Sequence, residues 1–429
     1  LPTGVSLLRQ RGVQGNALAL ERIVKECGCH VLTVDLAGGY ITEYGNGDPA
    51  TPLTLGTPEE LEAEAQQELD PAKRAVLKQG KRFARVAQRY QEAMVQTDPA
   101  ALALLERICL FRLGVEAETL ANIFTGEAAV NVSGAALAGL NPQELQRKLD
   151  WLVQMRIIEA TRIKSRQTGQ TRTFYNIHPA VRDGFMQGIG RDRATVSHQA
   201  IRTGLEVSLG NAPGRRPPLG RPWRYRYRGE WVSYADEFGI KPSDPVTLDL
   251  LEEIVYHAMA CGQVQEAFDV YWNKIGAYGN LGHRLGAYER GERICRQFGG
   301  GQSPEAVAAV LQAPQPTAPE PLPCLALAEA DQAIFINEWA VYLNALGRLD
   351  AAARCFEAMI AMYLRQEDWK NASAGNQNLR VVWLGLGQLG LAAEALGLAE
   401  QADDATGRQN SYFWQGAVSA LRGDRKSVV

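Results

Sequence analysis

One histidine of this sequence stands where its side chain is able to meet a ligand. The segment Tyr175-Asn-Ile-His178 ends a predicted strand, and Pro179 suits the first position of a helix because its φ is fixed. A strand-to-helix junction presents a side chain instead of burying it, so His178 is the candidate binding residue. The alternative is a histidine that caps the following helix or bonds within the core.

Patterns for catalysis or metal binding are missing from the sequence. The remaining histidines are scattered: His30, His198, His257 and His283. Neither Gly-x-Ser-x-Gly nor His-Glu-x-x-His occurs. The seven cysteines lack metal spacing, and Cys109 and Cys261 lie on apolar helical faces typical of a core. We therefore assign no catalytic and no metal-binding residue.

A phosphate-binding loop is also absent. The pattern Gly-x-x-x-x-Gly-Lys-Ser/Thr, whose backbone N–H groups cradle phosphates, occurs nowhere in the chain. We expect that this polypeptide alone does not hydrolyse ATP and is not an enzyme by itself. The start at Leu1 and the end at Val429 lead us to expect a fragment of a longer protein.

The elements that must position His178 form a predicted winged helix over residues 81–190. A helix over Lys81–Val95 leads into it, with Phe83, Val86 and Tyr90 on its apolar face. The remaining elements are helices over Ala101–Phe111 and Glu116–Phe124, a third opened by Asn141-Pro142, and strands Ile157–Lys164 and Arg172–Ile177 turned at Thr168-Gly169. Upstream, residues 1–49 predict a helical subdomain with helices over Asn16–Glu26 and His30–Tyr44, and residues 50–80 a linker.

These segments resemble a known family. Ala101-Leu-Ala-Leu-Leu-Glu-Arg-Ile-Cys-Leu-Phe-Arg112, Leu149-Asp-Trp-Leu-Val153 and Phe174-Tyr-Asn-Ile-His-Pro-Ala-Val-Arg182 are similar to the winged-helix subdomain of STAND signalling NTPases of the NB-ARC type. The stretch Glu26–Tyr40 resembles the helical ARC subdomain that precedes it there. The family usually has Gly-Gly-His-Pro-Leu-Ala-Leu at that point, whereas Cys29 replaces the second Gly here and Val31 the Pro.

The resemblance implies a role for His178. In this family the corresponding histidine contacts the β-phosphate of bound ADP and so holds the winged helix on the nucleotide-binding core. It also implies ADP or ATP as the cofactor of the full-length protein, although no cofactor is expected on this chain alone. The expected partners are an N-terminal nucleotide-binding core and, on activation, further copies of the protein.

The C-terminal half predicts pairs of helices. A recurrent phrase runs Gly262-Gln-Val-Gln-Glu-Ala267, Gly347-Arg-Leu-Asp-Ala-Ala352 and Gly387-Gln-Leu-Gly-Leu-Ala392, followed four positions later by Tyr271, Phe356 and Leu396. This spacing resembles tetratricopeptide (TPR) repeats, in which Gly makes the turn and Ala allows close approach of the helices. We expect a helical repeat unit over 246–312, a Pro-rich loop over 313–323 and TPR-like repeats over 324–429, with a groove for a protein or ligand.

Residues 191–245 predict an irregular connection, because Pro213-Gly-Arg-Arg-Pro-Pro-Leu-Gly-Arg-Pro222 cannot continue a helix. Arginines alternate there with Trp223, Tyr225, Tyr227 and Trp231, a mixture able to stack on nucleic acid. We favour stacking within the protein or docking onto a neighbouring domain. DNA binding by the winged helix is also disfavoured, because the helix Gln143–Arg156 is apolar and balanced in charge. The hairpin cations Arg162, Lys164, Arg166 and Arg172 keep DNA as an alternative.

Composition agrees with a protein of several domains. The 429 residues suggest about three domains, and the net charge of −3 predicts neither a polyanion nor a membrane surface as partner. No apolar run approaches the roughly 20 residues that a membrane span needs. An odd number of scattered cysteines favours a reducing, cytoplasmic location.

The predicted fold is therefore mainly α: a helical subdomain, a winged helix with a short β-hairpin, and a TPR-like α-solenoid. The predicted function is the regulatory and sensor portion of a STAND-type signal-transduction ATPase. Two alternatives stay open. One is a TPR adaptor without nucleotide function, and the other is a winged-helix transcription regulator.

Overall fold

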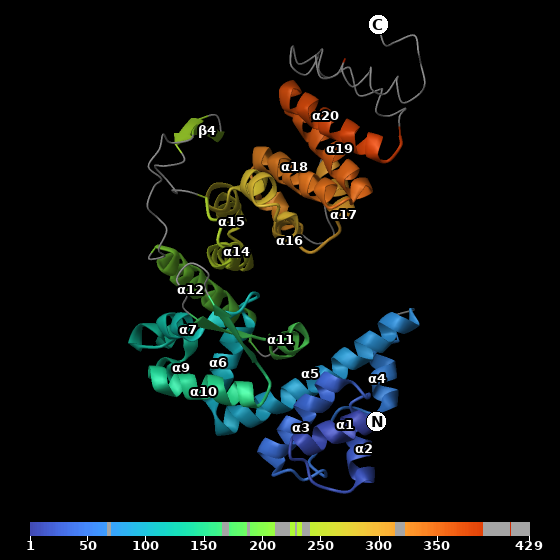
Figure 1. The fold of residues 1–429 in the computed structure, drawn as a ribbon, viewed down its shortest axis with the longest axis vertical. Coiled ribbons are helices and arrows are strands. Elements are labelled where there is room, and N and C mark those ends of the chain that lie inside the picture. Colours follow the sequence, from blue (N-terminus) through green and yellow to red (C-terminus); the bar gives the residue numbers. More distant parts are fainter. Residues whose placement is uncertain are drawn as a thin grey trace. The chain divides into compact units, whose positions relative to one another are not determined.

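The computed structural model is mainly α-helical, with a small antiparallel sheet of three strands (Figure 1). It describes residues 1–66, 70–164, 171–186, 189–210, 224–227, 230–233, 241–313, 322–388 and 412. The chain divides into two compact units, Leu1–Ser208 and Leu209–Val429, and each is described by itself.

The first unit opens with a bundle of three helices, α1 (Pro2–Gln10), α2 (Ala17–Glu26) and α3 (Val31–Gly45). The predictions of α2 and α3 are confirmed, whereas α1 was not predicted. Asn16 caps α2, because its side chain accepts a hydrogen bond of 2.9 Å from the backbone N–H of Ala19. Leu8 and Leu20 are fully buried in the core of this bundle.

The predicted linker over residues 50–80 carries helical structure in its second half. It contains α4 (Pro58–Glu64) and the start of α5 (Pro71–Thr97), so the long helix begins at Pro71 and not near Lys81. Thr57 and Glu60 form a capping box for α4. The predicted apolar face of α5 is confirmed, since Phe83, Val86 and Tyr90 are buried.

A group of helices with a hairpin follows, which we call the helix–hairpin unit (99–186). Its helices are α6 (Pro99–Cys109), α7 (Ala117–Phe124), η1 (Glu127–Ala129), α8 (Val130–Ser133), α9 (Ala135–Ala138), α10 (Pro142–Gln154) and α11 (Pro179–Met186). The predicted start of α10 is confirmed: Asn141 accepts a hydrogen bond of 2.9 Å from the backbone N–H of Glu144, whose carboxylate bonds back to the Asn141 N–H.

The sheet of this unit has the order β1-β3-β2, with both pairings antiparallel. Its strands are β1 (Val115–Glu116), β2 (Glu159–Lys164) and β3 (Thr171–Asn176). Tyr175 in the central strand pairs with Val115 on one side and Ala160 on the other. The hairpin prediction is confirmed, and its predicted turn at Thr168-Gly169 lies outside the described residues.

The predicted irregular connection over 191–245 is wrong at its start. Residues Arg191–Gly210 form α12, whose Ile201, Leu205 and Leu209 are buried at a spacing of one helical turn. Two short strands, β4 (Arg224–Tyr227) and β5 (Glu230–Ser233), pair antiparallel further on. The Pro-rich segment 213–222 lies outside the described residues.

Beyond β4 and β5, the described part of the second unit consists of helices that pack on one another. They are α14 (Pro245–Ala260), α15 (Val264–Asp269), η2 (Val270–Ile275), η3 (Gly279–Arg284), α16 (Tyr288–Phe298), α17 (Pro304–Gln312), η4 (Pro323–Ala326), α18 (Glu329–Ala345), α19 (Leu349–Arg365) and α20 (Trp369–Gly385). Helix α14 packs on α15, and α19 packs on α17, α18 and α20 (Figure 1). Both η2 and η3 are π-helical turns.

The recurrent glycines occupy equivalent turns. Gly262, between α14 and α15, has a φ of +73°, and Gly347, between α18 and α19, has a φ of +75°. Such left-handed backbone favours glycine. Tyr271 and Phe356, which follow four positions after each phrase, are 1% exposed. Gly387 has the same conformation, with a φ of +72°, but Ala392 and Leu396 lie outside the described residues. A superhelical stacking of these pairs stays a prediction.

Two leucines of α2 provide a matched test of the core assigned to the three-helix bundle. Leu20 is 0% exposed and Leu18 is 78% exposed. We expect Leu20→Ala to lower the free energy of unfolding by about 2–5 kcal/mol, because it leaves a cavity. The same change at Leu18 should cost no more than about 0.5 kcal/mol. Urea unfolding followed by circular dichroism measures both, and equal losses would contradict the assigned core.

Candidate functional site

His178 lies at the junction that the sequence predicts, between the end of β3 at Asn176 and the start of α11 at Pro179. Its side chain is exposed. Its ring Nδ1 accepts a hydrogen bond of 3.2 Å from the backbone N–H of Ala180, and its carbonyl oxygen accepts one of 2.9 Å from Arg182. His178 therefore caps α11 while its ring stays at the surface.

This cap decides which ring nitrogen is available. When the neutral ring accepts at Nδ1, its proton sits on Nε2. In that tautomer Nε2–H is a donor, and among the described residues it has no hydrogen-bond acceptor. The two interpretations of His178 are thus compatible, because one nitrogen caps the helix and the other is able to meet an anion.

The elements on both sides of His178 are fixed by packing. The β3 residue Tyr175 is 4% exposed, and its hydroxyl accepts a hydrogen bond of 2.8 Å from Gln146 of α10. On the other side, α11 packs on α5: an atom placed as Cβ on Gly184 would lie 3.0 Å from Ala87 Cβ. The Gln91 side chain also donates to the Phe185 carbonyl at 3.0 Å. Packing of β3 and α11 therefore holds the backbone of His178 in place.

One arginine takes part in the contact between the three-helix bundle and the helix–hairpin unit. Arg11 forms a two-pronged ion pair with Asp35, with Nε–Oδ1 and Nη2–Oδ2 distances of 2.6 and 2.7 Å. The same guanidinium donates to the carbonyls of Gln154 and Met155 at the C-terminal end of α10, at 3.2 and 3.4 Å. A cation suits this end because the last carbonyls of a helix lack partners within the helix. Sequence reasoning missed this contact, since nothing in the spacing relates Arg11 to α10.

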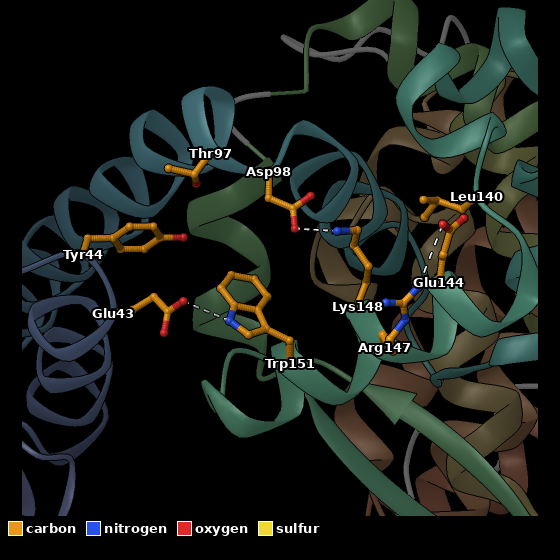
Figure 2. Close-up of a pocket in the computed structure, with 9 residues that line it drawn as sticks. All are labelled: Glu43, Tyr44, Thr97, Asp98, Leu140, Glu144, Arg147, Lys148 and Trp151. Carbon is orange, nitrogen blue, oxygen red and sulfur yellow. Dashed lines mark hydrogen bonds and ion pairs between the residues drawn. The ribbon is translucent and has the colours of Figure 1, made fainter. Parts of the chain in front are cut away.

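A cavity of about 590 Å³ lies between the end of α3, the end of α5 and α10. The Trp151 indole donates to Glu43 at 3.2 Å, and Lys148 pairs with Asp98 at 2.6 Å (Figure 2). Glu43 and Tyr44 of α3 lie on one side of the space and the charged residues of α10 on the other, with the Trp151 ring between them (Figure 2). The remaining lining residues are Thr97, Leu140, Glu144 and Arg147. The lining of the cavity is polar, since it carries both positive and negative charges. Its cations are paired with acids, and two aromatic rings lie among them.

The cations suggested for DNA are partly engaged within the chain. Arg172 of the hairpin pairs with Glu116 at 2.8 Å. On α10, Lys148 is held by Asp98, while Arg147 is 76% exposed and lies 3.9 Å from Glu144. Arg166 lies outside the described residues. The arrangement leaves few unpaired positive charges on the helix that would enter a groove.

The second unit contains a buried acid that sequence reasoning also missed. Glu338 of α18 is 7% exposed, and its Oε2 accepts hydrogen bonds of 2.7 Å from the Tyr271 hydroxyl and the Tyr278 backbone N–H. The Tyr271 hydroxyl also lies 3.1 Å from that of Tyr342. Burial raises the pKa of Glu338 to about 7, against the lowering effect of both hydrogen bonds. Both hydrogen-bond donors to this carboxyl are neutral, which explains why burial prevails.

Five of the seven cysteines are buried, Cys109 among them as predicted, whereas Cys29 is exposed and Cys261 is only half-buried. Burial raises the pKa of Cys27 to about 12 and raises that of Cys109 further still. A thiol is nucleophilic as its thiolate, so neither is primed to react. Among the residues that the structure describes, no group of three or more His, Cys, Asp or Glu is arranged to hold a metal ion. No described helix is long and apolar enough to cross a membrane.

No protein-family model and no curated protein matches the chain.

A double-mutant cycle measures the coupling energy of the Arg11–Asp35 pair. We expect a coupling energy of about 1–3 kcal/mol for Arg11→Met and Asp35→Asn, because the pair is forked and both side chains are 11% exposed. The exposed pair Arg354–Glu357 should couple by no more than about 0.5 kcal/mol. Urea unfolding of the four proteins of each cycle gives both values. A coupling in the first cycle no larger than in the second would contradict the assigned role.

Glu338 predicts a specific pH dependence. The folded protein holds the carboxyl proton up to a pH of about 7, whereas an unfolded chain releases it near pH 4.5. The folded state therefore binds more protons in this interval, and the free energy of unfolding should fall as the pH rises from about 4.5 to about 7, by up to about 3 kcal/mol. Glu338→Gln should remove that part of the fall. Denaturant unfolding across this range measures the difference between the two proteins, and a difference that stays constant with pH would refute the assignment.

Proposed function

We propose that this chain is the regulatory and sensor portion of a STAND-type signal-transduction ATPase. In this proposal the three-helix bundle corresponds to the helical ARC subdomain, the helix–hairpin unit (99–186) to a winged helix, and the helix pairs of the second unit to a TPR-like solenoid. The nucleotide belongs to a separate nucleotide-binding core with which the chain acts. The winged helix reports whether ADP or ATP is bound there.

The observation that carries this proposal is the presentation of His178. Its ring is exposed at the β3–α11 junction, its Nδ1 is occupied by the Ala180 N–H, and its Nε2–H is directed to no acceptor among the described residues. A donor of this kind suits a phosphate oxygen. A hydrogen bond to a charged group contributes about 1.5–3 kcal/mol, which shifts a two-state ratio by tenfold or more.

The switch works by a change of populations. In the resting form, ADP and His178 hold the helix–hairpin unit on the nucleotide-binding core. A protein or small ligand bound to the helix pairs of the second unit favours an open form, in which nucleotide exchanges and copies of the protein assemble. The free-energy difference between the two forms shifts by the difference in the ligand's binding free energy for them. A ligand that binds both forms equally therefore does not activate the protein.

A second function is favoured by the second unit taken alone. Gly262 and Gly347 make equivalent left-handed turns between packed helices, an arrangement that serves protein binding without any nucleotide. A TPR adaptor would need no phosphate-binding partner. It is distinguished from the first proposal by whether the complete gene encodes a phosphate-binding loop.

The test of the first proposal uses the protein encoded by the complete gene. We expect His178→Ala to weaken ADP binding by about tenfold or more and to raise activity in the absence of ligand. His283→Ala, at an exposed histidine of the second unit, is the matched control and should change neither. Isothermal titration calorimetry measures the affinity. Unchanged ADP affinity and unchanged resting activity in the His178 variant would refute the proposed contact.

A further inference from the structure

The cavity of about 590 Å³ between α3, the end of α5 and α10 combines aromatic rings with charged side chains (Figure 2). The two rings are those of Tyr44 and Trp151. The charged residues of the lining are the acids Glu43, Asp98 and Glu144 and the cations Arg147 and Lys148. Cavities of this volume are typical of small-molecule sites, and the charges of the lining decide which kind of molecule fits.

Acids outnumber cations in this lining by one, and the acid without a cation is Glu43. Lys148 Nζ lies 2.6 Å from Asp98 Oδ2, and Arg147 Nη2 lies 3.9 Å from Glu144 Oε1. Within the described part of the chain Glu43 forms no ion pair, and it is exposed to solvent, so a ligand in the cavity is able to reach its carboxylate. The cavity therefore carries one negative charge that a cationic ligand would balance.

Both aromatic rings are held in place beside this carboxylate. The Trp151 indole N–H donates to Glu43 Oε1 at 3.2 Å, so the edge of the ring and the acid lie together (Figure 2). The Tyr44 ring packs on two other tyrosines of the first unit, with centroid distances of 5.2 Å to Tyr40 and 6.0 Å to Tyr90. Aromatic rings attract a cation placed over their faces, and a nearby carboxylate adds to that attraction.

We propose that this cavity binds a small organic ammonium compound with a single positive charge. Glu43 supplies the opposite charge, and the rings of Tyr44 and Trp151 contact the alkyl groups next to the nitrogen. One positive charge suffices, because the other two acids of the lining each have a cation beside them. An anion would meet the charge of Glu43 instead. The proposal goes beyond the proposed function, since this site contains neither His178 nor any part of a separate nucleotide-binding core.

Calorimetric titration of the full chain with choline chloride at low ionic strength tests the site. Dimethylbutanol, in which carbon replaces the charged nitrogen, should bind at least about tenfold more weakly than choline. Glu43→Gln should weaken choline binding by about tenfold or more. Arg147→Gln should strengthen it, because the change removes a positive charge from the lining. Glu118→Gln, at an exposed acid of α7 outside the cavity, is the matched control and should leave the affinity unchanged. His178→Ala should also leave it unchanged, which separates this site from the proposed function.

Variants of Trp151 test the contribution of the ring. Trp151→Phe, which keeps a ring but loses the indole donor to Glu43, should bind choline with an affinity between those of wild type and Trp151→Leu. Circular dichroism and thermal unfolding verify that each variant is folded. The proposal is overturned by undetectable binding of choline at millimolar concentration, by equal affinities for choline and dimethylbutanol, or by equal affinities of Glu43→Gln and wild type. Weaker binding by Arg147→Gln, or an equal loss in Glu118→Gln, contradicts it as well.

Discussion

The packing of the first unit depends on one guanidinium, that of Arg11, which bonds to two different elements at once. Arg11 leaves the end of α1, forms a forked pair with Asp35 of α3, and places its remaining donors on the last carbonyls of α10. Those carbonyls need donors from outside their own helix. A single side chain therefore satisfies a carboxylate of the bundle and the end of a helix far along the chain. Tyr90 of α5 adds a second link, since its buried hydroxyl donates to the Leu36 carbonyl at 2.9 Å.

Local signals were enough to predict several elements. The Asn141-Pro142 cap fixes the start of α10, and Gly262 and Gly347 mark real turns, because each of these residues acts on its own neighbours. The two missed helical stretches also carried local signals. Asp70 and Pro71 open α5, and Ile201, Leu205 and Leu209 recur at one-turn spacing in α12. Proline and glycine in the surrounding sequence led to the prediction of loops for these segments.

Contacts between residues far apart in the chain could not be predicted from such local signals. Arg11 and Gln154 are 143 positions apart, and Tyr271 and Glu338 are 67 apart. Periodicity places each residue on a face of its own helix, but the partner depends on how distant helices pack.

Two buried acids of the second unit, Glu252 and Glu338, are stabilised in different ways. Glu252 is 1% exposed and is held by Arg293 at 2.6 and 2.8 Å and by Arg290 at 3.1 Å. Glu338 receives only neutral donors, a tyrosine hydroxyl and a backbone N–H. Neutral donors offset less of the cost of burying a charge than cations do. Glu338, whose pKa is raised, lies beside the π-helical turns, where the backbone N–H of Tyr278 points to it.

The loop after α2 explains in physical terms why a pair of glycines would suit this place. The N–H of Gly28 donates to the Lys25 carbonyl and that of Cys29 to the Val24 carbonyl, both at 2.9 Å, which is the Schellman pattern at a helix end. Gly28 and Cys29 have φ angles of +67° and +56°. Two consecutive residues thus adopt left-handed backbone, where a residue with a Cβ costs about 1 kcal/mol more than glycine. Cys29 departs from the Gly-Gly pattern in its side chain while its backbone keeps the conformation that glycine favours.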